Sequence, residues 1–229
     1  LVCVPKTIHS DIVGTNTSLC FDTAGSFTTE AVDRLHTTAE AHRRILVVEV
    51  MGRHAGWIAL HGGVAGGADV ILMPEIPYDF DKVARCIQDR DAWGARFSIV
   101  VVAEGAIPRG GEMSVIAKAR EGQQERLGGA GLFVANELEA RTGKETRSVV
   151  LGHLQRGGAP TAFDRTLATR FGGKAVELVL AGVFGVMVAN HPPDIVPVPL
   201  GEVVGKTRTV PLDYDLVHTA RALGVSFGD

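Results

Sequence analysis

The sequence has 229 residues, of which 45% are hydrophobic and 21% are charged, and its formal net charge is −3. These values are ordinary for a globular protein, and the charge offers no general attraction to nucleic acid. No apolar run approaches the roughly 20 residues of a membrane-spanning helix. Three widely spaced cysteines, an odd number, indicate neither a disulfide framework nor a zinc site. We therefore expect a cytoplasmic protein without nucleic-acid or membrane partners.

Short β-branched runs alternate with helical stretches along most of the chain, and the opening run, Leu1–Val4, is typical of the end of a buried strand. Strands are predicted over Ile45–Val50, Asp69–Met73, Ser98–Ala103 and Ser148–Leu151, with helices over Thr23–His42, Trp57–Ala65, Asp79–Asp89, Leu132–Arg141 and Thr161–Leu180. This alternation predicts a layered α/β fold built on a parallel sheet.

Two stretches fit that pattern less well. Residues 106–126 are polar and poorly periodic, which predicts a long surface loop with at most a short helix. Beyond Gly185 the signal is weaker, and it predicts strands over Met187–Asn190 and Ile195–Pro199 and a terminal helix over Tyr214–Leu223. The opening strand end also leads us to expect that the chain starts within a domain.

Polar clusters follow several predicted strands. Met51-Gly52-Arg53 follows the first, Glu104-Gly105 the third and His153 with Arg156 the fourth. Ligands of such folds gather at the carboxyl ends of the strands, so this coincidence is the first sign of a binding site.

Four arginines flank predicted strands: Arg44, Arg53, Arg147 and Arg156. Guanidinium groups match phosphate oxygens, so converging arginines favour a phosphorylated ligand. Taken singly, each arginine is better explained as a helix cap or a surface ion pair. His153 taken alone is likewise better explained as a structural histidine than as a ligand-binding one. Glu104 is equally compatible with sugar hydroxyls and with an ion pair. The polar loop Lys6–Asp11 suits phosphate chemistry but is a weak signal alone.

Together these segments resemble the phosphofructokinase family. Pro5–Asp11 reads PKTIHSD where the family reads PKTIDND or PGTIDND, and Val47–Arg53 matches VVEVMGR letter for letter. Leu151–Arg165 reads LGHLQRGGAPTAFDR against the family's LGHxQRGGxPxxxDR. Gly14–Ala24 and Gly143–Arg147 are similar to the family's GTDxTxGFDTA and GKETR. The resemblance implies a phosphofructokinase-type α/β fold that lacks part of its first, donor-binding domain.

The resemblance also implies a reaction and a set of site residues. Family members transfer a phosphoryl group from ATP or pyrophosphate, with Mg²⁺, to the 1-hydroxyl of fructose 6-phosphate in glycolysis. Catalytic positions are implied at His9, Asp11 and Arg53, and substrate-binding positions at Thr7, Arg44, Met51, Gly52, Arg53, Glu104, Arg147, His153 and Arg156. Arg44 and Arg147 are implied to serve a neighbouring subunit, which makes a homo-oligomer, usually a tetramer, the expected assembly.

The sequence departs from the family at the position of the catalytic base. His9 replaces the first Asp of TIDND, and Ser10 replaces the Asn. A neutral imidazole accepts a proton, but it lacks the negative charge that faces Mg²⁺. Since general bases contribute about 10²–10⁴-fold, we expect lower activity. A sequencing error or a drifted copy of the gene is the alternative explanation for His9 and Ser10.

The family's N-terminal GGDxPG-type segment, with its donor-phosphate loops and metal-binding Asp, has no counterpart here. No metal ligand is therefore expected in this chain. The sequence does not distinguish ATP from pyrophosphate as the phosphoryl donor, although the resemblance favours ATP. We expect residues 1–19 to be a remnant of the donor domain, 20–185 to bind the sugar phosphate, and 186–229 to pack back on the donor side. A non-catalytic sugar-phosphate-binding or regulatory subunit and an inactive fragment are the alternatives.

Overall fold

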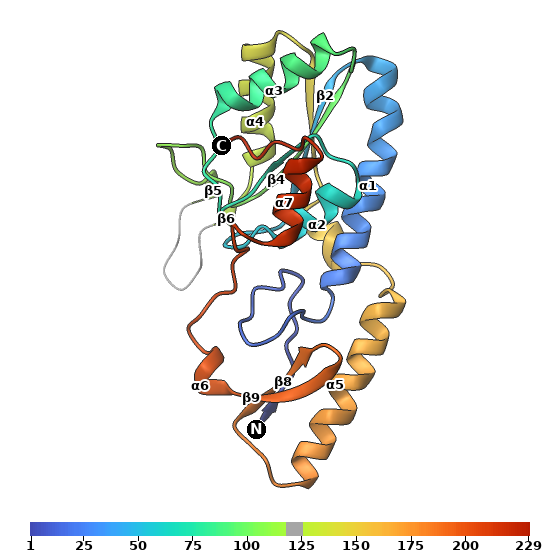
Figure 1. Cartoon of the computed structure of the whole chain (residues 1–229), viewed down its shortest axis with the longest axis vertical. Helices are drawn as coiled ribbons and strands as arrows, with labels where there is room; N and C mark the ends of the chain where they lie inside the picture. The colour runs from blue at the N-terminus through green and yellow to red at the C-terminus, as the bar shows by residue number, and fades with distance from the viewer. Residues whose placement is uncertain (118–125) are drawn as a thin grey trace.

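The computed structural model describes residues 1–117 and 126–229, which form two lobes joined by a narrower waist (Figure 1). The larger lobe holds a four-stranded sheet in the order β3-β4-β2-β7, in which all neighbouring strands are parallel. The smaller lobe holds a three-stranded sheet in the order β1-β8-β9. The α/β fold with a parallel sheet is confirmed.

Three of the four strands of the larger lobe, β2, β3 and β4, are buried along their whole length, whereas the edge strand β7 is partly exposed. Their bounds are Ile45–Val50 for β2, Val70–Leu72 for β3, Ser98–Ala103 for β4 and Thr146–Val150 for β7. Alternate residues of β2 face opposite sides of the sheet, as the strand period of two requires. Leu46 and Val48 join one apolar cluster, and Ile45 and Val47 join the other.

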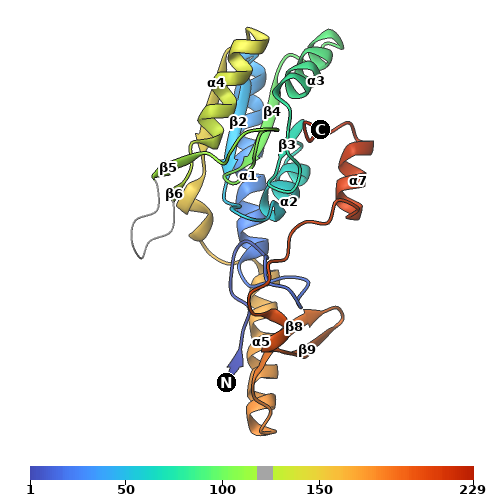
Figure 2. The same ribbon diagram turned by 90° about the vertical axis from the view of Figure 1, so that its left-hand side faces the viewer.

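Helices cover both faces of this sheet (Figure 2). On one side lie α1 (Phe21–His42) and α2 (Trp57–Ala65), and on the other lie α3 (Phe80–Ala92) and α4 (Ala130–Thr142). Asp79 caps the start of α3, because its carboxylate accepts a hydrogen bond of 2.8 Å from the Asp81 backbone N–H. Such a cap satisfies one of the unpaired N–H groups at a helix start.

The smaller lobe brings the two halves of the sequence together. β1 (Val2–Cys3) pairs in parallel with β8 (Val186–His191), and β8 pairs antiparallel with β9 (Asp194–Pro199). α5 (Ala162–Leu180) contacts all three strands, and α6 (Leu200–Val203) follows β9. The smaller lobe is therefore built from both ends of the chain around α5.

The last residues of the chain return to the larger lobe. α7 (Asp215–Ala222) contacts α2, and Ser226 forms a bridge beside Val70 of β3. Hence only the first part of the segment 186–229 lies in the smaller lobe. The three-part division expected from the sequence stays a prediction.

The polar stretch after β4 contains a strand pair. β5 (Val115–Ala117) and β6 (Arg126–Leu127) pair antiparallel, and no described residue of this stretch is helical. Residues 118–125 of the expected loop lie outside the described part. Within residues 1–117 and 126–229 no helix is long and apolar enough to cross a membrane.

Candidate functional site

The carboxyl ends of β2 and β4 meet at the waist of the molecule, facing the smaller lobe (Figure 1). The Gly52 N–H donates to the Glu104 carboxylate at 3.4 Å, and the Glu104 N–H donates to the Val50 carbonyl at 2.9 Å. These bonds follow from the register in which Val50 pairs with Ala103. The backbone of Met51 and Gly52 therefore lies beside Arg53 and Glu104 at the end of the sheet.

Close backbone packing shapes this surface. The Gly105 N–H donates to the Gly52 carbonyl at 3.1 Å, and a Cβ atom at position 105 would lie 2.0 Å from the Arg53 carbonyl oxygen. No side chain other than hydrogen fits there without backbone movement. The glycine after Glu104 is thus required for the two strand ends to touch.

A buried glutamine, which the sequence analysis did not single out, holds the first strand end. The Gln155 side chain accepts from the Met51 N–H at 2.7 Å and donates to the Thr28 hydroxyl at 2.9 Å. Gln155 is only 2% exposed. The sequence placed Gln155 inside the LGHLQRGG motif, but the motif letters do not show which of its residues point inward.

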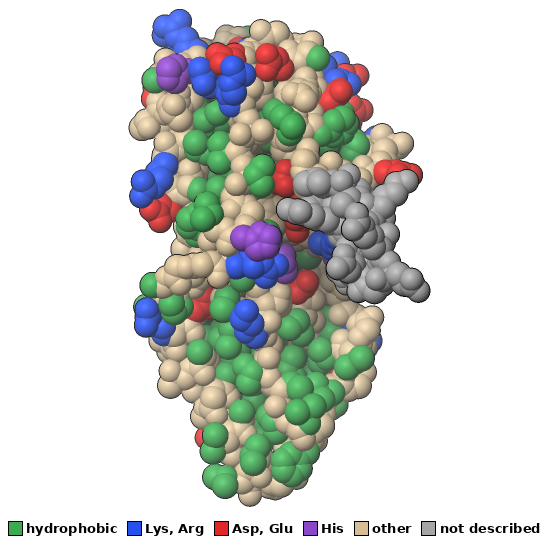
Figure 3. Space-filling view, turned by 180° about the vertical axis from the view of Figure 1, so that it is seen from behind, with side chains coloured by type: hydrophobic (Ala, Val, Ile, Leu, Met, Phe, Trp, Pro, Cys, Tyr) green, Lys and Arg blue, Asp and Glu red, His purple; other side chains and the backbone are tan. Residues whose placement is uncertain are grey.

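The neighbours of Gln155 point outward. Gly152–Arg156 forms a 3₁₀ helix after β7, in which His153 and Arg156 are exposed. Figure 3 shows histidine and basic side chains gathered at mid-height on the rear face, between the two lobes. The short helix therefore presents an imidazole and a guanidinium to the solvent beside the strand ends.

The Lys6–Asp11 loop reaches the same place from the smaller lobe. The Thr7 hydroxyl accepts from the His9 N–H at 3.1 Å, and the Thr7 carbonyl accepts from the Ser18 hydroxyl at 2.6 Å. His9 Nε2 lies 3.4 Å from a terminal nitrogen of Arg156. The structure thus brings the loop against the late motif, although 147 positions separate these two residues.

The charges around His9 confirm that the segments converge. Burial lowers the pKa of His9 from 6.5; the positive Arg156 and His54 lower it further, whereas the negative Asp11 and Glu104 oppose them. The Nδ1 atom of His9 is buried without a hydrogen-bond partner in the described part of the chain. His9 is therefore neutral near pH 7 and carries an available ring nitrogen.

Residues far along the chain hold the loop, and sequence reasoning missed them. Ser10 has a φ of 51°, in the left-handed region. Its carbonyl accepts from the Arg208 guanidinium at 2.9 Å, and the Asp11 carbonyl accepts from the Arg208 N–H at 2.8 Å. Asp164 of α5 accepts from the Cys20 and Thr23 N–H groups, each at 2.9 Å, at the start of α1. No local pattern predicts such long-range bonds.

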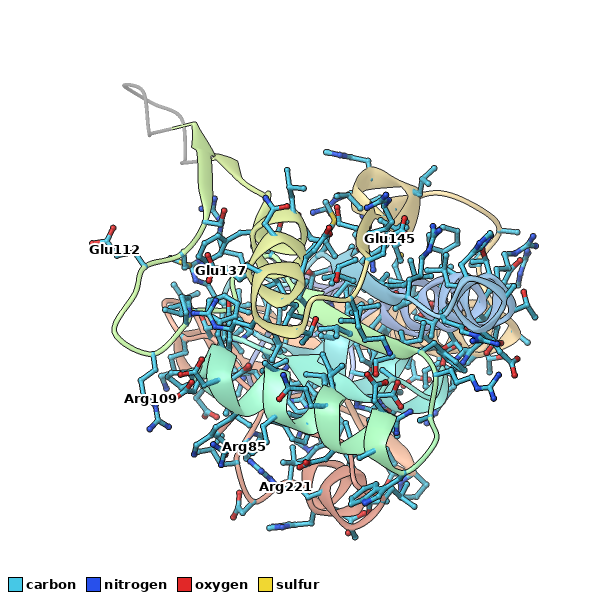
Figure 4. All side chains as sticks on the ribbon, turned by 90° about the horizontal axis from the view of Figure 1, so that it is seen from above. Arg85, Arg109, Glu112, Glu137, Glu145 and Arg221 are labelled. Carbon is cyan, nitrogen blue, oxygen red and sulfur yellow. The ribbon has the colours of Figure 1, made fainter. Side chains whose placement is uncertain are left out.

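Two of the predicted site residues lie elsewhere. Arg44 precedes β2, and Arg147 is the second residue of β7, so both lie at the amino ends of strands whose carboxyl ends carry the site. At about 3.3 Å per residue, the chain from Arg44 to Met51 spans roughly 23 Å and the chain from Arg147 to Leu151 spans roughly 13 Å. Both arginines pair with Glu145, at 3.3 Å and 2.6 Å. Glu145, which is labelled in Figure 4, lies in the turn between α4 and β7.

A cavity of about 180 Å³ opens beside the loop. Its walls come from both lobes and include Lys6, Ile8, Cys20, Thr23, Gln155 and Arg156, followed by Gly157, Gly158 and Pro160. The cavity therefore lies between the Lys6–Asp11 loop and the late glycine-rich motif.

A parallel sheet with polar groups collected at its carboxyl ends defines an α/β protein with a strand-end ligand site. The family model described as phosphofructokinase matches residues 1–179. The chain therefore belongs to the phosphofructokinase family.

Similar proteins include enzymes named for two donors. The chain is 55% identical over 229 residues to the ATP-dependent 6-phosphofructokinase of Chloroflexus aggregans, covering all of this chain and 63% of that protein. It is 55% identical over 215 residues to a pyrophosphate–fructose 6-phosphate 1-phosphotransferase of Amycolatopsis mediterranei, covering 93% and 62%. The chain thus spans less than two thirds of these relatives.

Solved structures agree with the fold. Phosphofructokinase from Saccharomyces cerevisiae matches with a TM-score of 0.77 and 35% identity, over 88% of this chain and 26% of that one. Pyrophosphate-dependent phosphofructokinase from Marinobacter aquaeolei matches with a TM-score of 0.79 and 26% identity, over 98% and 60%.

Proposed function

We propose that this chain is the sugar-phosphate half of a phosphotransferase that moves a phosphoryl group to the 1-hydroxyl of fructose 6-phosphate. One observation carries the proposal: the Met51–Arg53 strand end, Glu104, the His153–Arg156 helix and the Lys6–Asp11 loop converge around His9. The names of the relatives support the same substrate. A glycolytic role and a cytoplasmic location belong to this proposal.

The chemistry of the converging groups suggests their roles. Arg156, His153 and Arg53 offer cationic and imidazole donors for the 6-phosphate, because charge-assisted bonds to phosphate oxygens are short and strong. Glu104, Thr7 and the backbone of Met51 and Gly52 suit the sugar hydroxyls, since they supply both acceptors and donors. His9 and Asp11 then face the hydroxyl that receives the phosphoryl group.

The remaining two arginines support an oligomer. Arg44 and Arg147 lie at the opposite ends of the strands, too far away to reach the site in their own chain. We propose that they complete the phosphate site of a neighbouring subunit in a homo-oligomer, with a tetramer as the expected form. Their bonds to Glu145 keep both guanidinium groups close together for that purpose.

In this proposal, the binding site for the phosphoryl donor lies in the part of the relatives that this chain does not span. In the described residues, no group of three or more His, Cys, Asp or Glu side chains is placed to hold a metal ion. These residues do not by themselves make a site for the expected Mg²⁺, so we assign Mg²⁺ to none of them. ATP and pyrophosphate both stay in the proposal as donors, since the relatives carry both names.

His9 determines how well the proposed transfer proceeds. A neutral imidazole accepts the hydroxyl proton, but it carries no negative charge before the reaction and gains a positive one during it. An Asp in its place would stay anionic beside Arg156. We therefore expect His9 to retain binding and to slow transfer, and the relatives' names lend no support to a purely regulatory role.

Binding is tested on the chain itself by titrating fructose 6-phosphate in a calorimeter. Arg156→Ala is expected to weaken binding by at least 10-fold, as removal of a charge-assisted bond predicts. Arg34→Ala is the matched control, because Arg34 is exposed on α1, far from Arg156 in sequence, and pairs with Glu30 on the same helix. Unchanged affinity in Arg156→Ala would contradict the site assignment.

Transfer is tested in a chimera that joins this chain to the donor half of the Chloroflexus aggregans relative. With saturating ATP or pyrophosphate, His9→Asp is expected to raise kcat by about 10²-fold or more over His9. Equal turnover in the two forms would show that His9 does not impair catalysis. Binding without turnover in both forms would instead indicate a non-catalytic sugar-phosphate-binding protein.

A further inference from the structure

A cavity of about 230 Å³ lies on another side of the Lys6–Asp11 loop from the residues of the proposed sugar-phosphate site. We call it the aromatic cavity, and its walls include Phe21, Asp22, Trp57, His61, Arg208 and Tyr214. None of its lining residues has a role in the proposed phosphoryl transfer. The cavity therefore needs an explanation of its own.

Aromatic rings form half of its walls, from Phe21, Trp57, His61, Phe163 and Tyr214. Tyr214 lies edge-on to Trp57, with ring centres 5.4 Å apart, and Phe21 lies edge-on to His61 at 5.2 Å. The rings of His61 and Tyr214 are 6.2 Å apart and tilted by 34°. Aromatic pairs favour such spacings, so a flat ring entering the cavity would find further edge and face contacts of the same kind.

A cation without an acidic partner lies at one end. The Arg208 guanidinium lies 3.9 Å from the centre of the Trp57 ring and donates through Nη1 to the Ser10 carbonyl. No carboxylate forms an ion pair with Arg208 in the described part of the chain. Since arginine carries five N–H donors in a planar fork, donors remain for a bidentate anion.

Two further groups orient a ligand. Neither ring nitrogen of His61 has a hydrogen-bond partner among the described residues, and burial followed by the charge of Arg208 lowers its pKa. The imidazole is therefore neutral near pH 7 and offers one donor and one acceptor. Asp22, whose carboxylate accepts from the Thr161 hydroxyl at 2.6 Å, is the negative group of the cavity and repels an anion from its side.

We propose that the aromatic cavity binds a small aromatic carboxylate, with its carboxylate on Arg208 and its ring packed against the half-buried rings of Tyr214, His61 and Phe21. The half-buried cation selects the charge, and the edge-on rings select a flat ligand. The cavity shares Ser10 and Arg208 with the Lys6–Asp11 loop, but the proposal does not rest on the sugar-phosphate assignment.

The test uses 4-fluorobenzoate as the probe and its neutral counterpart 4-fluorobenzamide as the control ligand, both followed by ¹⁹F NMR line broadening with the full chain. We expect saturable broadening with the carboxylate and at least 10-fold weaker binding of the amide. Trp57 provides a second readout in the Trp93→Phe background, because the chain has only two tryptophans. Its emission should change with the same saturation curve.

Arg208→Gln should weaken binding of 4-fluorobenzoate by at least 10-fold, whereas Arg34→Gln on the exposed face of α1 should leave it unchanged. Because Arg208 also holds the Ser10 loop, His61→Leu serves as a second variant that keeps the loop contacts and removes the imidazole; it should weaken binding at least threefold. Equal binding of the amide and the carboxylate, or unchanged binding in a folded Arg208→Gln or His61→Leu protein, would overturn the proposal.

Discussion

The two backbone elements that meet beside His9, the Met51–Arg53 strand end and the Lys6–Asp11 loop, are held in different ways. The strand end continues a fully buried strand, and buried side-chain and backbone bonds fix it from Gln155 and Glu104. The loop belongs to no strand, except for one bridge from Lys6 to Leu19, and depends on Arg208 for its shape. The strand end is therefore part of the folding core, whereas the loop that carries His9 is attached to it.

This difference has a functional meaning. A surface fixed by the core tolerates few substitutions, and here its letters match the family's motif. A loop held by a few bonds changes at a lower cost in stability, and here the family's Asp and Asn are replaced by His9 and Ser10. The following predictions test whether substitutions at the strand end lower the free energy of unfolding more than substitutions in the loop.

The largest effect is expected from Gly105→Ala at the strand ends. The new Cβ would meet backbone atoms of Arg53 and Gly52 that cannot move aside, so the free energy of unfolding should fall by about 3 kcal/mol or more. Urea denaturation measures this change. Gly172→Ala in α5 is the control: no atom lies within 4 Å of its new Cβ, and a gain of about 0.5–1 kcal/mol is expected from helix propensity. A loss below 1 kcal/mol at position 105 would contradict the packing described.

The next effect is expected from Gln155→Met, which preserves approximate volume and removes both buried bonds. The Met51 N–H then loses its partner, and the Thr28 hydroxyl oxygen loses the donor from Gln155 while it still donates to the Ala24 carbonyl, which together should cost about 2 kcal/mol. The neighbouring Arg156→Met is exposed and should change stability by less than about 0.5 kcal/mol while weakening fructose 6-phosphate binding. If both variants lose the same free energy of unfolding, the description of Gln155 as buried and Arg156 as exposed is wrong.

A smaller effect is expected in the loop, where Ser10 has a left-handed backbone. Both Ser10→Gly and Ser10→Ala remove the hydroxyl that lies 3.3 Å from Arg208, but only glycine relieves the conformation. The glycine variant should be more stable than the alanine variant by about 1 kcal/mol. Ser18, which is not in the left-handed region, should show the reverse order of the same two substitutions. Thermal unfolding of the four variants decides between these outcomes.

The smallest effect concerns pH. Because burial lowers the pKa of His9 in the folded chain below 6.5, the unfolded chain binds the proton first. The stability that His9 contributes as a neutral group is complete above pH 6.5 and is lost as pH falls toward the lower pKa. Urea midpoints between pH 5 and 8 should decrease less steeply with acid in His9→Gln. An imidazole proton resonance of His9 that titrates above pH 6.5 would contradict this sign.

Much of the fold was predictable from local sequence. The bounds of β2, β4 and α2 agree with the expectation residue for residue, because strands buried on both faces are continuous apolar runs with sharp ends. The edge strand β7 begins earlier than expected, at Thr146, since an edge position accepts the polar Thr146 and Arg147. α1 begins at Phe21 because Asp164, far away in sequence, bonds the backbone at its start.

The sequence by itself determined which residues are candidates for the chemistry: the motif letters pointed to the strand-end residues, to the late His153 and Arg156, and to His9 at the position of the family's Asp. Only the tertiary structure decided which neighbour in a motif points inward, as with Gln155 and Arg156, and which distant residue holds the loop, as Arg208 does. It also separated Arg44 and Arg147 from the other arginines. The physical reason is that residue type fixes what a side chain can bond, whereas the paired sheet register and long-range bonds fix what lies within reach.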